Sequence, residues 1–196
     1  ETQVRLVAKT GNSYTSDIAV DALTFRSQAC AHTVMTYPYH ENFENEALGW
    51  VQESNDDIDW ISYQGATPSY GTGPNEAATG LKYMYVEASG SNAPQKKAGL
   101  MSPCFDLSER ISFLERYGIN TELNLQITFS FHMYGADQGK LLVQISEDDG
   151  HSWTTRYSIE GAYGDRWYGG SVWLGDYKRE TIRVRFLAET GDGPLS

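Results

Sequence analysis

The sequence has 196 residues, enough for one well-buried domain and part of another. Its formal net charge of -11 argues against nucleic-acid and anionic-membrane partners, because no basic stripe is present to neutralise phosphates. Thirteen Tyr, five Trp and nineteen Gly with only 21% charged residues predict a turn-rich β-sandwich made for the extracellular side.

The predicted elements are strands separated by turns. Apolar and polar residues alternate in most of these segments, which is the period of a strand with one buried face. In chain order we expect strands at 3–9, 17–25, 42–46, 82–88, 97–104, 124–133, 141–145, 167–174 and 182–188.

The connecting segments have a different composition. Residues 26–41 have weak periodicity and include Pro38, so we read them as a linker. Residues 65–75 contain two Pro and three Gly and predict a long loop, since those residues do not fit a sheet interior. Residues 108–122 predict an insertion or loop.

An acidic and aromatic stretch runs from Phe43 to Tyr63. If residues 57–60 form a strand, Asp57 and Asp59 share one face while Ile58 and Trp60 share the other. Glu44 would join the two carboxylates if its own extended run lies beside that strand, and oxygen ligands of this kind suit a hard cation. The alternative is a solvated acidic strand edge.

Residues 146–153 predict a hairpin turn, because Asp149-Gly150 lies between two alternating segments. Their spacing, Ser146-x-Asp148-x-Gly150-x-x-Trp153, resembles the Asp-box found in unrelated β proteins. The resemblance implies a folded turn with Trp153 packed under it and no chemistry.

The chain contains two cysteines, Cys30 and Cys104, without Cys-x-x-Cys spacing. This is poor evidence for zinc, and in a secreted chain a single disulfide is the favoured interpretation. Two buried free thiols are the alternative.

Catalysis finds little support in the sequence. The four histidines, His32, His40, His132 and His151, are scattered, and neither a His-Glu-x-x-His nor a Gly-x-Ser-x-Gly motif is present. Carboxylate pairs of the glycosidase kind stay open, because their separation in space is invisible in sequence.

Two segments of the chain are near-copies of each other. Residues 4–16 align with residues 184–196 at an offset of 180, and Val, Arg, Ala, Thr, Gly and the last Ser are identical. We expect that the chain begins near the end of one repeat and stops short of the end of the next. Residues 1–25 are then terminal strands of a preceding repeat, and 42–196 is a domain that lacks its last strand.

Many spaced motifs together resemble the MAM domain, an extracellular module, and in particular the MAM repeats of secreted bacterial multidomain proteins. The matching segments are Phe43-Glu44, Gly49-Trp50, 56–60, 67–69, 72–74, 83–87, 100–103, 131–135 and Asp17-Ile-Ala-Val-Asp21. The vertebrate four-cysteine pattern is absent. The resemblance implies an all-β jelly-roll sandwich of two antiparallel sheets with a structural calcium site formed by Glu44, Asp57, Asp59 and Asp21.

Our leading functional hypothesis is therefore a non-catalytic interaction or adhesion module, secreted or at the cell surface. Its expected partners are an extracellular protein or glycan and neighbouring copies or repeats, assembled head to tail through strand exchange. The alternative is a carbohydrate-binding module appended to a secreted hydrolase or protease, with Tyr63, Tyr70, Tyr163, Trp167 and Tyr168 as candidate sugar contacts.

Overall fold

The structure is a computed structural model. It describes residues 7–9, 19, 30–45, 49–108, 125–177 and 180–193. Strands dominate these residues, and none of their helices is long and apolar enough to cross a membrane. The predicted segments at 3–9 and 17–25 and the insertion at 108–122 lie almost wholly outside the described residues.

Eleven strands and two 3-10 turns are bounded in the described part of the chain. They are β1 (Thr33–Val34), β2 (Val51–Gln52), β3 (Ile61–Gln64), β4 (Lys82–Tyr85), η1 (Gly90–Asn92), β5 (Lys97–Met101), β6 (Cys104–Asp106), β7 (Gln126–Phe131), β8 (Lys140–Ser146), β9 (Thr154–Glu160), β10 (Tyr168–Trp173), η2 (Gly175–Tyr177) and β11 (Thr181–Glu189).

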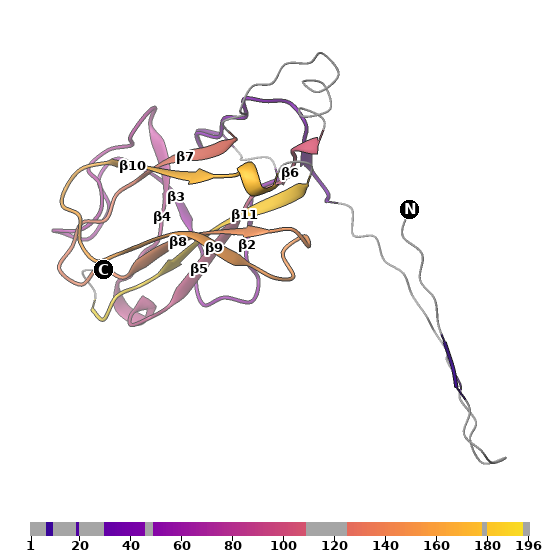
Figure 1. The fold of residues 1–196 in the computed structure, drawn as a ribbon. Coiled ribbons are helices and arrows are strands. Elements are labelled where there is room, and N and C mark those ends of the chain that lie inside the picture. The colour runs from indigo at the N-terminus through magenta and orange to yellow at the C-terminus, as the bar shows by residue number, and fades with distance from the viewer. Residues whose placement is uncertain are drawn as a thin grey trace.

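The strands form one large sheet and two separate pairs. In the seven-stranded sheet, β11 lies centrally and pairs antiparallel with β5, β6 and β8, while β9 extends the sheet beyond β8. The pairs β3–β4 and β7–β10 are both antiparallel. Figure 1 shows β7 and β10 as a layer across from β8, β9 and β11. The predicted all-β sandwich is therefore confirmed.

Alternating residues of the two layers meet in the core. Val143 and Ile145 of β8 and Ile182 and Val184 of β11 are at most 2% exposed, and they cluster with Val172 of β10. Their neighbours Leu142, Thr181 and Arg183 are more exposed, as the period of a half-buried strand requires, whereas Gln144 and Ser146 beside Ile145 are buried. Burying a side chain of this size contributes about 1.5–3 kcal/mol.

Two predicted strands in the acidic stretch are wrong. Residues 43–45 form bends, with Phe43 at φ 56°, and residues 53–60 form a loop. The reason is that acidic side chains here accept backbone N–H groups: Asp56 accepts from Gly99 and Asp57 from Lys97. These bonds reach residues 40 and 43 positions away in the sequence and hold the segment against β5 as a loop.

The side chain of Gln52 closes this loop by bonding to both backbone groups of Trp60. Its side-chain oxygen accepts the Trp60 N–H at 3.0 Å, and its side-chain nitrogen donates to the Trp60 carbonyl at 2.8 Å. The indole of Trp60 then donates to the Ala98 carbonyl at 2.9 Å. The loop is consequently fixed to β5 at both of its ends.

Residues 30–41 pack on the sheet. β1 pairs parallel with β6, and the Tyr37 hydroxyl contacts the carbonyl oxygens of Val34 and Asp106 at 3.1 and 3.0 Å. The Cys30–Cys104 disulfide joins the start of this segment to β6, with a Cα–Cα distance of 6.0 Å. The disulfide prediction is confirmed.

The Asp-box prediction describes the turn between β8 and β9 correctly. Asp148 Oδ1 accepts hydrogen bonds from the Ser152 N–H at 2.8 Å and the Ser146 hydroxyl at 2.7 Å, and its Oδ2 accepts one from the Ser152 hydroxyl at 2.6 Å. These bonds lower the pKa of Asp148 to about 2. Trp153 lies under the guanidinium of Arg185, 4.4 Å from its ring centre.

Replacing both cysteines, in Cys30→Ser with Cys104→Ser, is expected to lower the free energy of unfolding by about 4 kcal/mol, because the bond closes a long loop in the unfolded chain. Urea unfolding with and without reductant measures this. Reductant should lower the midpoint of the parent chain and leave the double variant unchanged. A parent midpoint that ignores reductant contradicts the prediction.

Asp148→Asn is expected to destabilise the protein at neutral pH. The folded carboxyl has its pKa lowered to about 2, below the unfolded value of about 3.9. Its contribution is therefore present above about pH 4 and lost as pH falls towards 2. The stability difference between variant and parent should shrink over that window. Glu147→Gln, which removes the same charge from the neighbouring residue, is the matched control.

Candidate functional site

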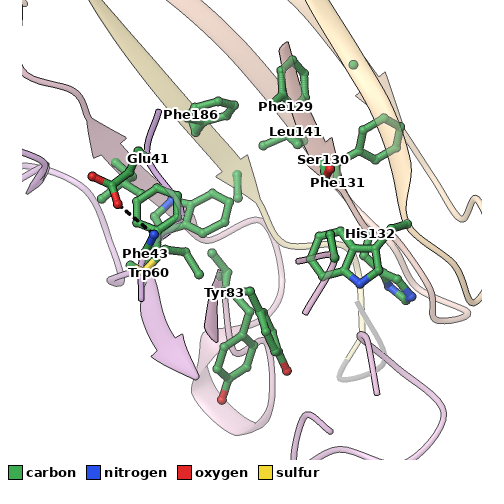
Figure 2. A pocket seen from close by; sticks show the side chains of 18 of the residues that line it. Glu41, Phe43, Trp60, Tyr83, Phe129, Ser130, Phe131, His132, Leu141 and Phe186 are labelled. Carbon is green, nitrogen blue, oxygen red and sulfur yellow. Dashed lines mark hydrogen bonds between the residues drawn. The ribbon is translucent and has the colours of Figure 1, made fainter. Parts of the chain in front are cut away.

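A large apolar groove lies between the two strand pairs and the inner face of the seven-stranded sheet. Its volume is about 1300 Å³. Figure 2 shows the side chains of Phe129, Phe131, Leu141 and Phe186 around it, with Trp60 and Tyr83 across from them. Leu100 of β5 and Val184 and Ala188 of β11 complete the floor.

Strand edges, as well as strand faces, border this groove. Every residue from Leu125 to Tyr134 lines it, and so does every residue from Lys82 to Ala88. No residue of β3 lines it, although β3 pairs with β4. The groove therefore lies along the edge of β4 that β3 leaves free. In the described part of the chain β7 pairs with β10 alone, so its second edge is free as well.

The groove is far larger than the voids of a packed interior. Native cores hold few voids larger than one water molecule, whereas this volume corresponds to roughly 40 waters at ~30 Å³ each. Solvent or a further segment of chain must fill it.

Aromatic contacts shape the end of the groove near Phe43. The Phe43 N–H donates to the Glu41 carboxylate at 2.8 Å (Figure 2), in a backbone turn with positive φ. This turn directs the Phe43 ring against Trp50, with ring centres 5.5 Å apart, and Trp50 stacks on Phe186 at 6.1 Å. The apolar floor is thus continuous from Phe43 to β11.

The opposite end of the groove contains a buried histidine. The His132 side chain is 3% exposed, and its Nε2 lies 3.2 Å from an Asp165 oxygen. Burial lowers the pKa of His132, although Asp165 opposes that shift. Its Nδ1 is the one buried side-chain polar atom without a hydrogen-bond partner among the residues described. Most buried polar atoms in proteins have a hydrogen-bond partner, so this nitrogen is an exception.

The predicted calcium ligands have other partners. Glu44 accepts the N–H groups of Leu81 and Lys82, at 2.6 and 2.9 Å, and these bonds lower its pKa. Asp57 accepts the Lys97 N–H at 2.9 Å and lies 3.6 Å from the Lys96 ammonium; the Lys97 bond is the main cause of its lowered pKa. Asp21 lies outside the described residues.

Asp59 belongs to a different acidic group. It raises the pKa of Asp56 together with Glu53, although burial of Asp56 is the larger cause. Glu53 in turn pairs with Arg185 at 2.6 Å. Among the described residues, one group of three His, Cys, Asp or Glu side chains has its potential ligand atoms within 4.8 Å of one another. It consists of Cys30, Cys104 and Asp149. Two of its members form the disulfide, so it is no metal centre. The described residues do not assemble the expected calcium shell, and calcium binding stays a prediction.

Four of the five predicted sugar-contact aromatics serve internal contacts. Trp167 donates to the Glu76 carbonyl at 2.9 Å and packs edge-on against Tyr83. Tyr168 stacks on Phe131, and Tyr163 packs against both. Tyr63 lies against Tyr83 and Tyr85. The pKa of Tyr83 is raised to about 12, mainly by burial and further by the neighbouring Tyr85 and Tyr63. Tyr70, 98% exposed, is the exception.

Sequence reasoning predicted an unfilled strand position in this domain, but not which residues border the groove. The available signal was Lys82 to Ala88, whose two faces both looked apolar although the strand ends at Tyr85. A strand with two apolar faces must be covered on both faces, and the sequence indicated this without identifying the covering elements.

The described residues thus form a β-sandwich with a disulfide, a closed loop at Trp60 and an open apolar groove. The family model of the MAM domain, meprin/A5/mu, matches residues 42–196. The chain therefore belongs to the MAM domain family.

Three curated proteins illustrate the similarity. The rat MAM domain-containing glycosylphosphatidylinositol anchor protein 2 is 32% identical over 118 residues, covering 56% of this chain and 12% of that protein. Human MAM domain-containing protein 2 is 28% identical over 67% of this chain and 18% of that protein. The chicken anchor protein 1 is 27% identical over 66% and 13%, respectively. The chain thus spans between about an eighth and a fifth of these relatives.

Calcium binding through Glu44 and Asp57 is tested by thermal unfolding with millimolar calcium and with chelator. Occupancy at 100 times Kd stabilises by about 2.7 kcal/mol, which raises the Tm by about 5–10 °C. Asp57→Asn should abolish that difference, and Asp192→Asn, an exposed acid elsewhere, should keep it. If Asp57→Asn lowers the Tm equally in both solutions, its carboxylate serves only the Lys97 N–H and the calcium prediction is wrong.

Proposed function

We propose that this chain is a non-catalytic interaction module that works on the extracellular side, in a secreted or cell-surface protein. The family supports this, since two of the relatives above are named as glycosylphosphatidylinositol anchor proteins. The Cys30–Cys104 bond supports it too, because disulfides persist in oxidising compartments. Structural calcium is part of the proposal.

The observation that carries the proposal is the groove. It offers apolar side chains on its floor and the free edges of β4 and β7 on its walls. An edge supplies backbone hydrogen bonds, and pockets for alternate side chains supply selectivity, which together bind extended peptide segments. The partners that fit are therefore protein segments, including those of neighbouring copies, ahead of a glycan.

Ser130 is the position at which to test this function. It is an exposed residue of β7 on the groove wall (Figure 2), so Ser130→Arg places a long charged side chain there without filling the core. Ser158→Arg on β9 is the matched control, because Ser158 is equally an exposed strand serine and does not line the groove.

We expect the full chain, immobilised in millimolar calcium, to retain proteins from a panel of purified ectodomains, and Ser130→Arg to weaken that binding at least tenfold. Ser158→Arg should bind as the parent does. A glycan array run in parallel separates the alternative. Specific retention by glycans alone, unchanged in Ser130→Arg, contradicts the proposal and favours a carbohydrate-binding module.

A further inference from the structure

The layer formed by β7 and β10 has an outer face that points away from the seven-stranded sheet (Figure 1). Phe129, Phe131 and Val172 of these strands pack in the core, so strand alternation turns the residues between them outward. In the antiparallel register the outward residues lie opposite one another as Gln126 with Trp173, Thr128 with Ser171 and Ser130 with Gly169. All six are exposed.

Trp173 is the large aromatic side chain of this outer face. It is 49% exposed, although tryptophan is highly buried on average. Its indole lies directly against Gly175 of η2, where a Cβ atom would stand 2.4 Å from Cε2 and 2.5 Å from Nε1 of the ring. The close contact restricts the orientation of the indole, while about half of the side chain stays open to solvent.

The rest of the outer face is polar and uncharged. Neither β7 nor β10 contains an Asp, Glu, Lys or Arg, whereas β8, β9 and β11 each contain such residues, in a chain of net charge -11. Gln126, Thr128 and Ser171 carry amide and hydroxyl groups that both donate and accept hydrogen bonds. In the part of the chain that the structure describes, no other side chain or backbone group occupies these amide and hydroxyl groups.

These groups match the chemistry of a neutral sugar chain. A sugar ring has C–H groups on its faces, which pack against an aromatic ring, and hydroxyls at its edge, which both donate and accept hydrogen bonds. An acidic polysaccharide would be repelled by a chain with net charge -11. A protein partner would find a single aromatic ring among polar side chains, without the apolar centre that protein interfaces have.

We propose that the outer face of β7 and β10 is a binding site for a neutral polysaccharide, which stacks on Trp173. Its hydroxyls exchange hydrogen bonds with Gln126, Thr128 and Ser171. The strip from Trp173 to Gly169 is about 13 Å long at ~3.3 Å per residue, so it can hold more than one sugar ring.

This site goes beyond the proposed function, because it lies on a different side of the same strands. Neither Trp173 nor Ser171 lines the groove. A segment that filled the groove would meet the free edge of β7 and leave the outer face of the layer open. The two sites can therefore be tested separately.

Electrophoresis of the full chain through gels that contain a soluble polysaccharide tests the proposal. The panel consists of neutral β-glucan, xylan and glucomannan, with polygalacturonate as an acidic counterpart. At least one neutral polymer should retard the parent, and polygalacturonate should not. Trp173→Ala should weaken that binding roughly tenfold or more, because it removes the stacking surface. Tyr70→Ala is the matched control: Tyr70 is 98% exposed elsewhere, and the variant should bind as the parent does.

Two further variants separate contact from positioning. Ser171→Arg places a long charged side chain on the outer face and should abolish the retardation, whereas Ser158→Arg, at an exposed serine of β9, should keep it. Gly175→Ala removes no group that we expect to contact the sugar, but its methyl group displaces the indole, so it should weaken binding as Trp173→Ala does. Thermal unfolding checks that every variant is folded.

A parent chain that no neutral polymer retards overturns the proposal, and so does retardation that folded Trp173→Ala and Ser171→Arg both keep. Retardation that is lost in Tyr70→Ala instead places the sugar at the loop of residues 65–75 and equally contradicts it. If no polymer binds and Trp173→Ala weakens ectodomain binding, the outer face is a protein interface and the polysaccharide site is wrong.

Discussion

The rest of the structure depends on β11, the strand through which the large sheet is joined. Its alternating side chains divide between two tasks. Ile182, Val184 and Phe186 face the core, where they meet β8, β7 and the floor of the groove. On the other face, Arg183 forms a salt bridge with Asp149 at 3.2 Å, and Arg185 forms one with Glu53 at 2.6 Å. Arg185 is also fixed by Gln144 and by the ring of Trp153. One strand with period two therefore ties the core to the Asp-box turn, the Trp60 loop and the disulfide region.

The sequence predicted those strands in which burial is one-sided. β7, β8, β10 and β11 lie within a few residues of their expected ranges, because alternation of apolar and polar residues reports the burial of one face. The strands predicted at 42–46 and 57–60 are wrong. Their acidic residues Glu44 and Asp57 accept hydrogen bonds from backbone N–H groups far along the chain, at Leu81, Lys82 and Lys97. No local pattern contains that information. The pairing of Cys30 with Cys104 needed no geometry, since the chain has only these two cysteines.

The residues that border the groove could not be predicted for a related reason. The groove depends on how two strand pairs and the large sheet are placed relative to one another. Considered alone, β3–β4 and β7–β10 are ordinary antiparallel pairs. Pairing between segments distant in the sequence is set by complementary faces across the core rather than by local preference. Within the predicted site, the same limitation applies to the carboxylates: Glu44 and Asp57 both accept backbone N–H groups, yet at different places, on the approach to β4 and at β5.

A free strand edge beside apolar side chains is a hazard for a protein outside the cell, because it can pair with any exposed strand. Natural sheets limit the hazard with charges, bulges or a covering segment. Charged residues, among them Lys82, Glu87 and Lys140, line this groove together with the aromatic Phe129 and Phe131 of β7. Such a surface is specific only if a matching strand is always at hand.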